Sequence, residues 1–192
     1  MLPPLIDALL VSTLVVTVAE MGDKTQLLAI LLAARFRARW PILGGILAAT
    51  LLNHALAAVA GAAAAALLGG AWFRWAVGLG FLLMAGWALI PDRTDGEVRA
   101  RGGVFWTTAL AFFLVEMGDK TQVATALLAA RYQEVVAVTL GTTIGMLLAN
   151  APAVWLGERI TRVVPLAWVR IGAAAVFAGL GLLVLAFGLD RG

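Results

Sequence analysis

Six long apolar stretches, separated by short segments that contain proline, glycine and arginine, make up most of this 192-residue chain. Each stretch has about the length, roughly 20 residues, that an α-helix needs to cross the hydrocarbon core of a bilayer. The pattern therefore predicts an all-α integral membrane protein with six transmembrane helices. The predicted spans are Leu5–Ala34, Pro41–Leu68, Trp72–Ile90, Val104–Ala130, Val135–Leu156 and Leu166–Leu189.

The composition agrees with a membrane protein and excludes several other classes. Hydrophobic residues make up 62% of the chain and charged residues only 13%, whereas soluble domains have about 45–50% apolar and about 25% charged residues. The net charge of +3 comes mainly from arginines between the apolar stretches. Arginines in such positions determine topology, so we expect no nucleic-acid partner. The absence of cysteine excludes disulfides and thiolate metal sites.

The two halves of the chain share a repeated sequence. Residues Glu20–Arg35 read EMGDKTQLLAILLAAR and residues Glu116–Arg131 read EMGDKTQVATALLAAR, so 12 of 16 positions match at an offset of 96 residues. Each copy contains three predicted spans, and because three is odd the copies must cross the membrane in opposite directions. The sequence predicts two inverted three-helix repeats: residues 1–91 and 104–192, joined by a cytoplasmic linker at 92–103.

The distribution of arginines predicts the orientation. Nine arginines lie in the loops after the first, third and fifth spans or close to them, against three on the other side. Because positive residues favour the cytoplasm, this places the central loop in the cytoplasm and both termini outside. The nine are Arg35, Arg37, Arg39, Arg93, Arg99, Arg101, Arg159, Arg162 and Arg170.

Charged residues also lie within the predicted spans, near the bilayer midplane. A glutamate, an aspartate three residues later and a lysine four residues later should share one helical face, and a glutamine extends the polar stripe. A lone charge at this depth costs at least about 2.5–3.5 kcal/mol. The two sets are Glu20, Asp23, Lys24 and Gln26, and Glu116, Asp119, Lys120 and Gln122.

The net charge of the repeated motif indicates a cation site. A purely structural alternative is a Glu–Lys pair that holds helices together, but such pairs would sum to zero. Each motif has two carboxylates and one ammonium group, so the two motifs together carry −2. One divalent cation or two protons would neutralise that charge. Oxygen ligands without thiolates suit the hard cations Ca²⁺, Mn²⁺ and Mg²⁺.

Other polar or small residues near the motifs have more than one interpretation. A glycine in each motif predicts either a helix break or a close helix contact. The neighbouring threonine contributes a hydroxyl to the site or bonds back to its own helix. A histidine in the second span is a ligand, a proton carrier or a packing residue, and two asparagines are candidates to support the site. These residues are Gly22, Gly118, Thr25, Thr121, His54, Asn53 and Asn150.

The duplicated E-x-G-D-[K/R]-[T/S] motif resembles that of the Golgi-type cation/proton exchanger family, once labelled uncharacterised protein family sixteen. That family includes bacterial manganese exporters, and the resemblance covers nearly the whole chain. It implies cation ligands at Glu20, Asp23, Glu116 and Asp119, with Lys24 and Lys120 balancing their charge. The chain lacks the long acidic central loop and the N-terminal targeting region of eukaryotic members, which favours a bacterial plasma-membrane protein.

Together these features predict a secondary active transporter that exports a divalent cation in exchange for protons by alternating access. The resemblance favours Mn²⁺, with Ca²⁺ as an alternative. The cation is the substrate, and no cofactor or enzymatic activity is expected. The competing hypotheses are a passive cation channel, with carboxylates along a continuous pore, and a membrane-embedded hydrolase that uses a carboxylate pair. The small-residue faces fit internal packing and oligomerisation equally well, so the sequence leaves the oligomeric state open.

Overall fold

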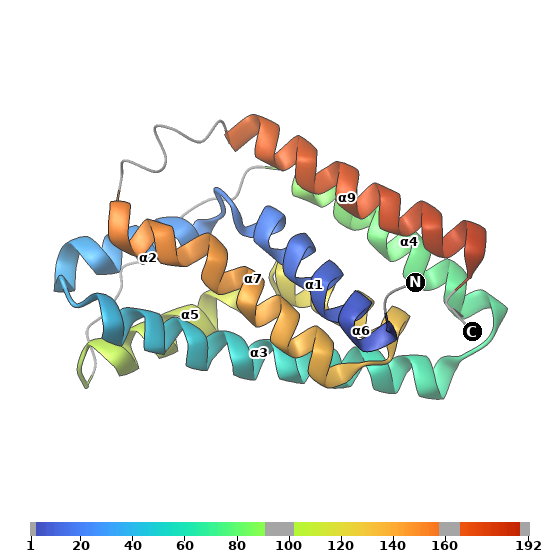
Figure 1. The fold of residues 1–192 in the computed structure, drawn as a ribbon, viewed down its shortest axis with the longest axis horizontal. Helices are drawn as coiled ribbons and strands as arrows, with labels where there is room; N and C mark the ends of the chain where they lie inside the picture. Colours follow the sequence, from blue (N-terminus) through green and yellow to red (C-terminus); the bar gives the residue numbers. More distant parts are fainter. Residues whose placement is uncertain (1–2, 91–101, 158–165, 189–192) are drawn as a thin grey trace.

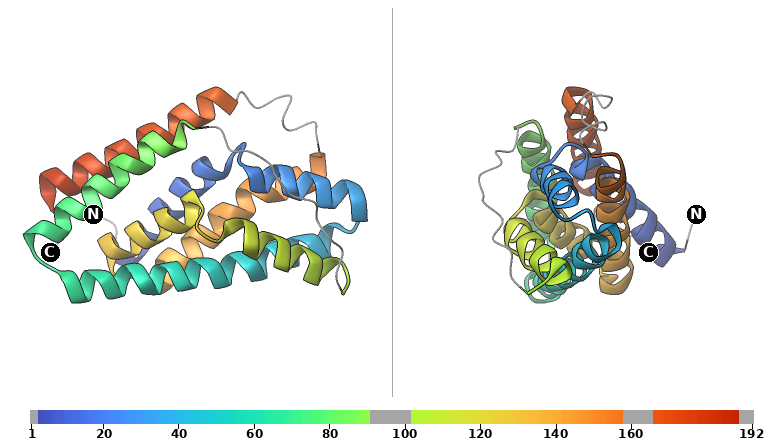
Figure 2. Two further views of the ribbon diagram at one scale, coloured as in Figure 1. Left: turned by 180° about the vertical axis from the view of Figure 1, so that it is seen from behind. Right: turned by 90° about the vertical axis from the view of Figure 1, so that its left-hand side faces the viewer.

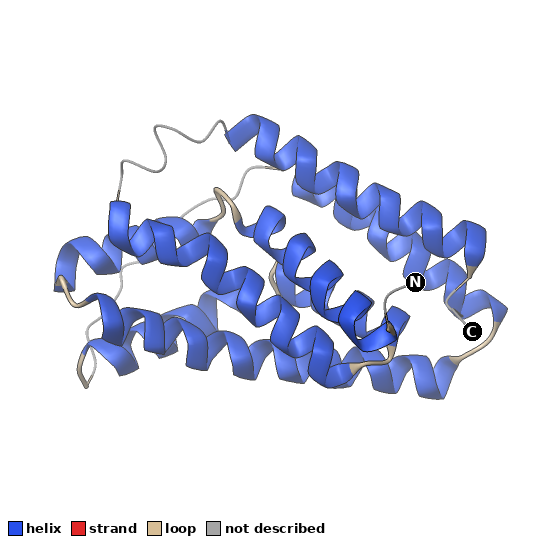
Figure 3. Ribbon diagram, in the orientation of Figure 1, coloured by secondary structure: helices blue, strands red, loops and turns tan. Residues whose placement is uncertain are grey.

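The computed structural model describes residues 3–90, 102–157 and 166–188, and in these ranges the chain forms α-helices and no strand (Figures 1 and 3). The predicted all-α class is therefore confirmed for the described residues. The helices are α1 (Pro4–Glu20), α2 (Lys24–Phe36), α3 (Arg39–Leu68), α4 (Ala71–Ala88), α5 (Val104–Glu116), α6 (Lys120–Tyr132), α7 (Val135–Leu156) and α9 (Leu166–Phe187).

Three of the described helices are long and apolar enough to cross a membrane by themselves. These are α3, α7 and most of α9, and the bent pair of α1 and α2 makes a fourth if it is counted as one span. The predicted third span corresponds to α4, and the predicted fourth span to α5 and α6 together. Length and composition of the described helices thus support three or four spans.

The first and fourth predicted spans are not continuous helices. α1 and α2 meet at an angle of 71°, and residues 117–119 separate α5 from α6. The glycine of each break has a positive φ, 82° at Gly22 and 79° at Gly118, a conformation that glycine adopts without steric cost. The prediction that Glu20, Asp23 and Lys24 share one helical face is therefore wrong, because the helix ends between the glutamate and the aspartate.

Each half of the chain packs its long helix on the broken helix of the other half. α7 lies along α1, and α3 lies along α5 and α6 (Figures 1 and 2). Both contacts depend on a glycine: an added Cβ would lie 2.8 Å from the Phe105 carbonyl oxygen at Gly45 and 2.5 Å from the Leu9 carbonyl oxygen at Gly141. The two glycines differ by 96 positions, as do their partners. The repeat in the sequence is therefore also a repeat of packing contacts.

The ends of the helices define two ends of the molecule. α1 begins and α9 ends at one of them, which we call the terminal end; α2 ends and α5 begins at the opposite end (Figures 1 and 2). The chain runs from the terminal end to the opposite end along α1 and α2, and it runs the other way along α5 and α6. Most of the predicted cytoplasmic linker, with Arg93, Arg99 and Arg101, lies outside the described residues, as do Arg159 and Arg162.

Candidate cation site

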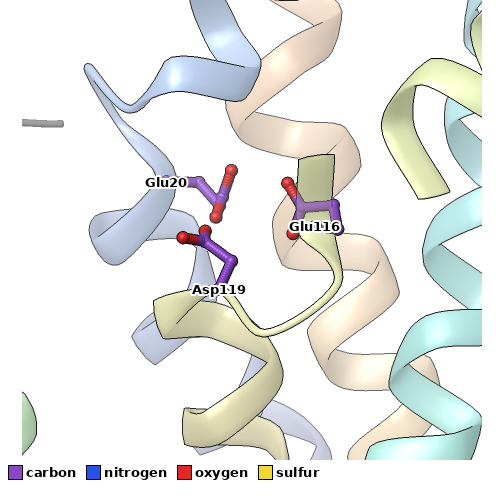
Figure 4. A group of neighbouring side chains, drawn as sticks. All are labelled: Glu20, Glu116 and Asp119. Atoms are coloured by element: carbon purple, nitrogen blue, oxygen red, sulfur yellow. The ribbon is translucent and has the colours of Figure 1, made fainter. Parts of the chain in front are cut away.

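Three carboxylates from the two repeated motifs come together where the broken helices meet. Glu20 is the last residue of α1, Glu116 is the last of α5, and Asp119 directly precedes α6. One oxygen of each lies within 4.8 Å of one oxygen of each of the others (Figure 4). All three side chains are buried, with exposed fractions of 0%, 0% and 2%. The cluster is therefore assembled from both halves of the chain.

The helix breaks explain how the carboxylates can converge. Asp23 and Asp119 occupy the N-cap positions of α2 and α6, yet neither side chain caps its helix with a hydrogen bond. Their carboxylates are therefore available for other interactions while they remain near the positive end of a helix dipole, which favours negative charge. The breaks place Glu20 at the end of α1 and Asp119 just before α6, and the two carboxylates can therefore approach each other.

The glutamines of the motif stabilise the breaks. Gln26 Oε1 accepts a hydrogen bond of 3.0 Å from the backbone N–H of Gly22, and Gln26 Nε2 donates one of 3.0 Å to the Ala149 carbonyl on α7. Gln122 Oε1 likewise accepts a hydrogen bond of 2.6 Å from the Gly118 N–H. The sequence predicted that both glutamines extend a polar stripe on one helix. Instead they pair with backbone N–H groups that the break leaves without a helical partner.

The threonines of the motif hold the glutamates. Thr25 Oγ1 donates a hydrogen bond of 2.5 Å to Glu20 Oε2, and Thr121 Oγ1 donates one of 3.0 Å to Glu116 Oε2. All four side chains are buried. Of the two interpretations left open by the sequence, the structure has the one in which the hydroxyl meets the site. Each hydrogen bond crosses a helix break and fixes one oxygen of a glutamate.

We expect that replacing either threonine by valine weakens cation binding by about 5- to 10-fold. A hydrogen bond to a charged group contributes about 1.5–3 kcal/mol, and without it the glutamate carboxylate is no longer held in the orientation that binds the cation. Thr25→Ser and Thr121→Ser keep the hydroxyl and should bind like the parent. Equilibrium binding of Mn²⁺ to purified protein measures the difference. Equal affinity in the valine and serine variants would contradict a role for the hydroxyls.

The ion pair at the site joins the two motifs. Lys24 Nζ lies 2.8 Å from Asp119 Oδ1, so the lysine of the first motif pairs with the aspartate of the second. Lys120 donates a hydrogen bond of 3.1 Å to the carbonyl of Ile90. The purely structural alternative required a Glu–Lys pair within one helix, and the ion pair found at the site is not of that kind.

The cluster retains negative charge and free oxygen atoms. Three carboxylates and the Lys24 ammonium sum to −2 when all are ionised. In the described part of the chain, no hydrogen-bond donor meets Glu20 Oε1, Glu116 Oε1 or Asp119 Oδ2, although all three atoms are buried. Buried acceptors without partners are costly, and oxygen atoms of carboxylates are the ligands that hard divalent cations prefer. The arrangement therefore fits a hard divalent cation.

The remaining predicted site residues lie around the cluster. Asp23 is buried and interacts electrostatically with Glu116, but it does not belong to the group of three. His54 is fully buried and also lies outside the group. Asn53 donates a hydrogen bond of 3.0 Å to the Phe113 carbonyl, one turn before Glu116 on α5. Asn150 donates to the carbonyl and the sulfur of Met146 within α7.

Two apolar residues that the sequence did not single out lie close to the glutamates along α1 and α5. Val16 and Phe112 lie one turn before Glu20 and Glu116 and are fully buried. They are related by the same offset of 96 residues, and this is the signal that would have identified them. Both belong to one buried apolar cluster of the core.

Comparison with known proteins identifies the family. The model of the family described as "Divalent cation/proton antiporter GDT1" matches residues 8–96 and 104–191. The chain belongs to this family. It is similar to a protein of Vibrio cholerae serotype O1 (strain ATCC 39541 / Classical Ogawa 395 / O395), named "Putative manganese exporter", with 46% identity over 173 residues that cover 89% of this chain and 86% of that one. No solved structure matches the chain.

Membership of the family confirms the broad functional prediction. The protein is a multi-pass membrane transporter of divalent cations and protons. It is not an enzyme, so the alternative of a membrane-embedded hydrolase is wrong. The cation is cargo, and the transporter needs no separate cofactor.

Proposed function

We propose that the protein exports Mn²⁺ from the bacterial cytoplasm in exchange for protons, and that the cation binds to Glu20, Glu116 and Asp119. The observation that carries this proposal is the buried cluster itself, in which three carboxylates from two motifs lie within 4.8 Å of one another. Asp23 lies beside the cluster and adds negative charge to the site. Lys24 holds Asp119 in place, and Thr25 and Thr121 orient the glutamates.

The architecture we propose is six transmembrane spans in two inverted repeats, residues 1–91 and 104–192, with 92–103 as the linker. Three observations support it. The packing contacts of Gly45 and Gly141 recur at an offset of 96 residues. Corresponding helices of the two halves run in opposite directions in Figure 1. The family model matches the chain in two segments, one in each half. In this arrangement α1 with α2, and α5 with α6, each count as one broken span.

Alternating access at one shared site follows from this architecture. A cation from the cytoplasm binds the ionised carboxylates and exchanges most of its water for their oxygens. The two halves then rearrange, and the site opens to the outside. Protons from the outside neutralise the carboxylates and release the cation, and the protonated site returns. The exchange is coupled because the cation and the protons compete for the same oxygen atoms.

Mn²⁺ is the substrate we favour, since the similar Vibrio cholerae protein is named as a manganese exporter. Carboxylate oxygens also accept Ca²⁺, so Ca²⁺ should compete for the site. We place the opposite end of the molecule in the cytoplasm of a bacterial plasma membrane, because Arg35, Arg37 and Arg39 lie there. Both termini are then outside.

Transport into inverted membrane vesicles tests the proposal. With an acidic lumen, we expect saturable ⁵⁴Mn²⁺ uptake that raises the lumenal pH, and uptake should stop when an ionophore collapses the pH gradient. Unlabelled Ca²⁺ added to the medium around the vesicles, on the cytoplasmic side of the protein, should reduce the uptake by competition. Vesicles without the protein are the control. Uptake that is linear in Mn²⁺ concentration and independent of the pH gradient would contradict exchange and favour a channel.

A further inference from the structure

Two glycines that correspond in the repeat have opposite surroundings. Gly61 lies on α3 against α6, where an added Cβ would be only 2.0 Å from the Ala126 carbonyl oxygen. Gly157, 96 positions later, follows α7, and a Cβ added there would meet nothing within 4 Å. The first position is therefore a closed contact between helices of the two halves. The second is open.

The open position borders a groove at the opposite end of the molecule. The groove has a volume of about 1110 Å³ and lies between α2, the start of α3 and the end of α7. Its lining includes Ile30, which corresponds to Ala126 in the repeat, and Gly157. The repeat relates α6 to α2 and α3 to α7. At the position where α6 contacts α3, the corresponding helices α2 and α7 border a groove.

Neighbouring alanines on α2 and α6 show the same difference. Ala34 lines the groove and is exposed. Its counterpart Ala130 on α6 is buried, with an exposed fraction of 4%. The five residues around them are identical, LLAAR in both motifs, so this segment alone does not explain why one alanine is exposed and the other buried, although Ile30 stands where the other motif has Ala126. The difference lies in how closely each helix approaches its partner.

We propose that the Gly61–Ala126 contact and the groove between Ile30 and Gly157 are the two gates of the exchanger, closed at the terminal end and open at the cytoplasmic end. This inference rests on the proposed function, because it requires two inverted halves that exchange conformations. The groove is the vestibule through which the cation enters. The hydrogen bond from Gln26 Nε2 to the Ala149 carbonyl joins α2 to α7, one helical turn before Ile30 on α2.

The repeat then defines the other state of the cycle. In the outward-open state, α6 moves away from Gly61, and α2 approaches Gly157. Any side chain at Gly61 prevents the first gate from closing, since even one methyl group has no space there. Gly61→Ala should therefore favour the outward-open state, in which Ala130 is accessible and Ala34 is covered.

Cysteine labelling measures this exchange directly, because the chain has no cysteine of its own. Ala34→Cys and Ala130→Cys would be made singly, and their rates of reaction with N-ethylmaleimide would be compared in inverted vesicles at rest. We expect the Ala34→Cys variant to react at least about tenfold faster than the Ala130→Cys variant. Adding Gly61→Ala should reverse the order. Gly86→Ala is the matched control, because a Cβ at Gly86 meets nothing within 4 Å.

A second measurement does not require a variant of Gly61. During Mn²⁺ uptake driven by a pH gradient, the rate at Ala130→Cys should rise and the rate at Ala34→Cys should fall. Equal rates at rest, or rates that stay unchanged while ⁵⁴Mn²⁺ accumulates in the same vesicles, would overturn the assignment of the gates but leave the transport function standing. Absence of uptake in vesicles with the unaltered protein would instead overturn the proposed function.

Discussion

Replacing Glu116 by glutamine should lower Mn²⁺ transport by about 100-fold or more, and replacing Glu20 should have an equally large effect. Glu116 and Glu20 are both fully buried, and each contributes one carboxylate to the cluster of three. Either substitution removes one negative charge from a site that carries −2 with Lys24 included. A 100-fold loss corresponds to about 2.7 kcal/mol of cation binding, which is modest for a charge removed from a buried site.

Comparing the transport rates of the Glu20→Gln and Glu116→Gln variants distinguishes one shared site from two independent sites. A shared site predicts the same loss from either motif, whereas two independent sites predict that each variant keeps about half of the transport. Glu134→Gln is a suitable control, since Glu134 lies at the start of α7 and outside the cluster. Initial rates of ⁵⁴Mn²⁺ uptake, corrected for protein amount, measure the effect. A Glu20→Gln or Glu116→Gln variant with more than a third of the parent rate would contradict the shared site.

Replacing Gly118 by valine should reduce Mn²⁺ transport by about 10- to 100-fold through the backbone alone. Gly118 has φ 79°, and a Cβ there meets nothing within 4 Å, so the new side chain has space. A β-branched residue in the left-handed region nevertheless costs about 1–3 kcal/mol. The break would relax toward regular helix, and the carboxylates of Glu116 and Asp119 would no longer converge with that of Glu20.

An asparagine at the same position provides the matched comparison. Asparagine adopts the left-handed conformation more readily than other residues with a side chain, so Gly118→Asn should retain most of the transport that Gly118→Val loses. Gly86→Ala adds a Cβ with free space in the last turn of α4 and should leave transport unchanged. If the valine and asparagine variants are equally active, the conformation of Gly118 is not what assembles the site.

The sequence predicted the membrane class, the repeat and the motif that holds the site, because these depend on apolar runs and identical residues. It did not predict how the motif is built. A continuous helix from Glu20 to Lys24 would place their side chains on one face. In the structure α1 ends at Glu20 and α2 begins at Lys24, and Gly22 in the break has a positive φ. A glycine in an apolar helix is compatible with a break or with a close contact, and only the three-dimensional structure distinguishes them.

Interactions between the halves were also beyond the sequence. The pairing of Lys24 with Asp119 depends on which helices lie side by side, and no spacing along the chain reports it. The same holds for the exclusion of Asp23 from the cluster of three. The repeat does predict that corresponding residues have similar surroundings. At Gly61 and Gly157 the surroundings differ, and the repeated sequence did not predict that difference.

The stoichiometry of Mn²⁺ binding tests the central claim most directly. Electron paramagnetic resonance of Mn²⁺ titrated into purified protein counts the ions that leave solution. One cation site made from both motifs predicts one Mn²⁺ per chain in the parent and none in either Glu20→Gln or Glu116→Gln at the same concentration. Two Mn²⁺ per chain in the parent, or one retained in either variant, would contradict a single shared site.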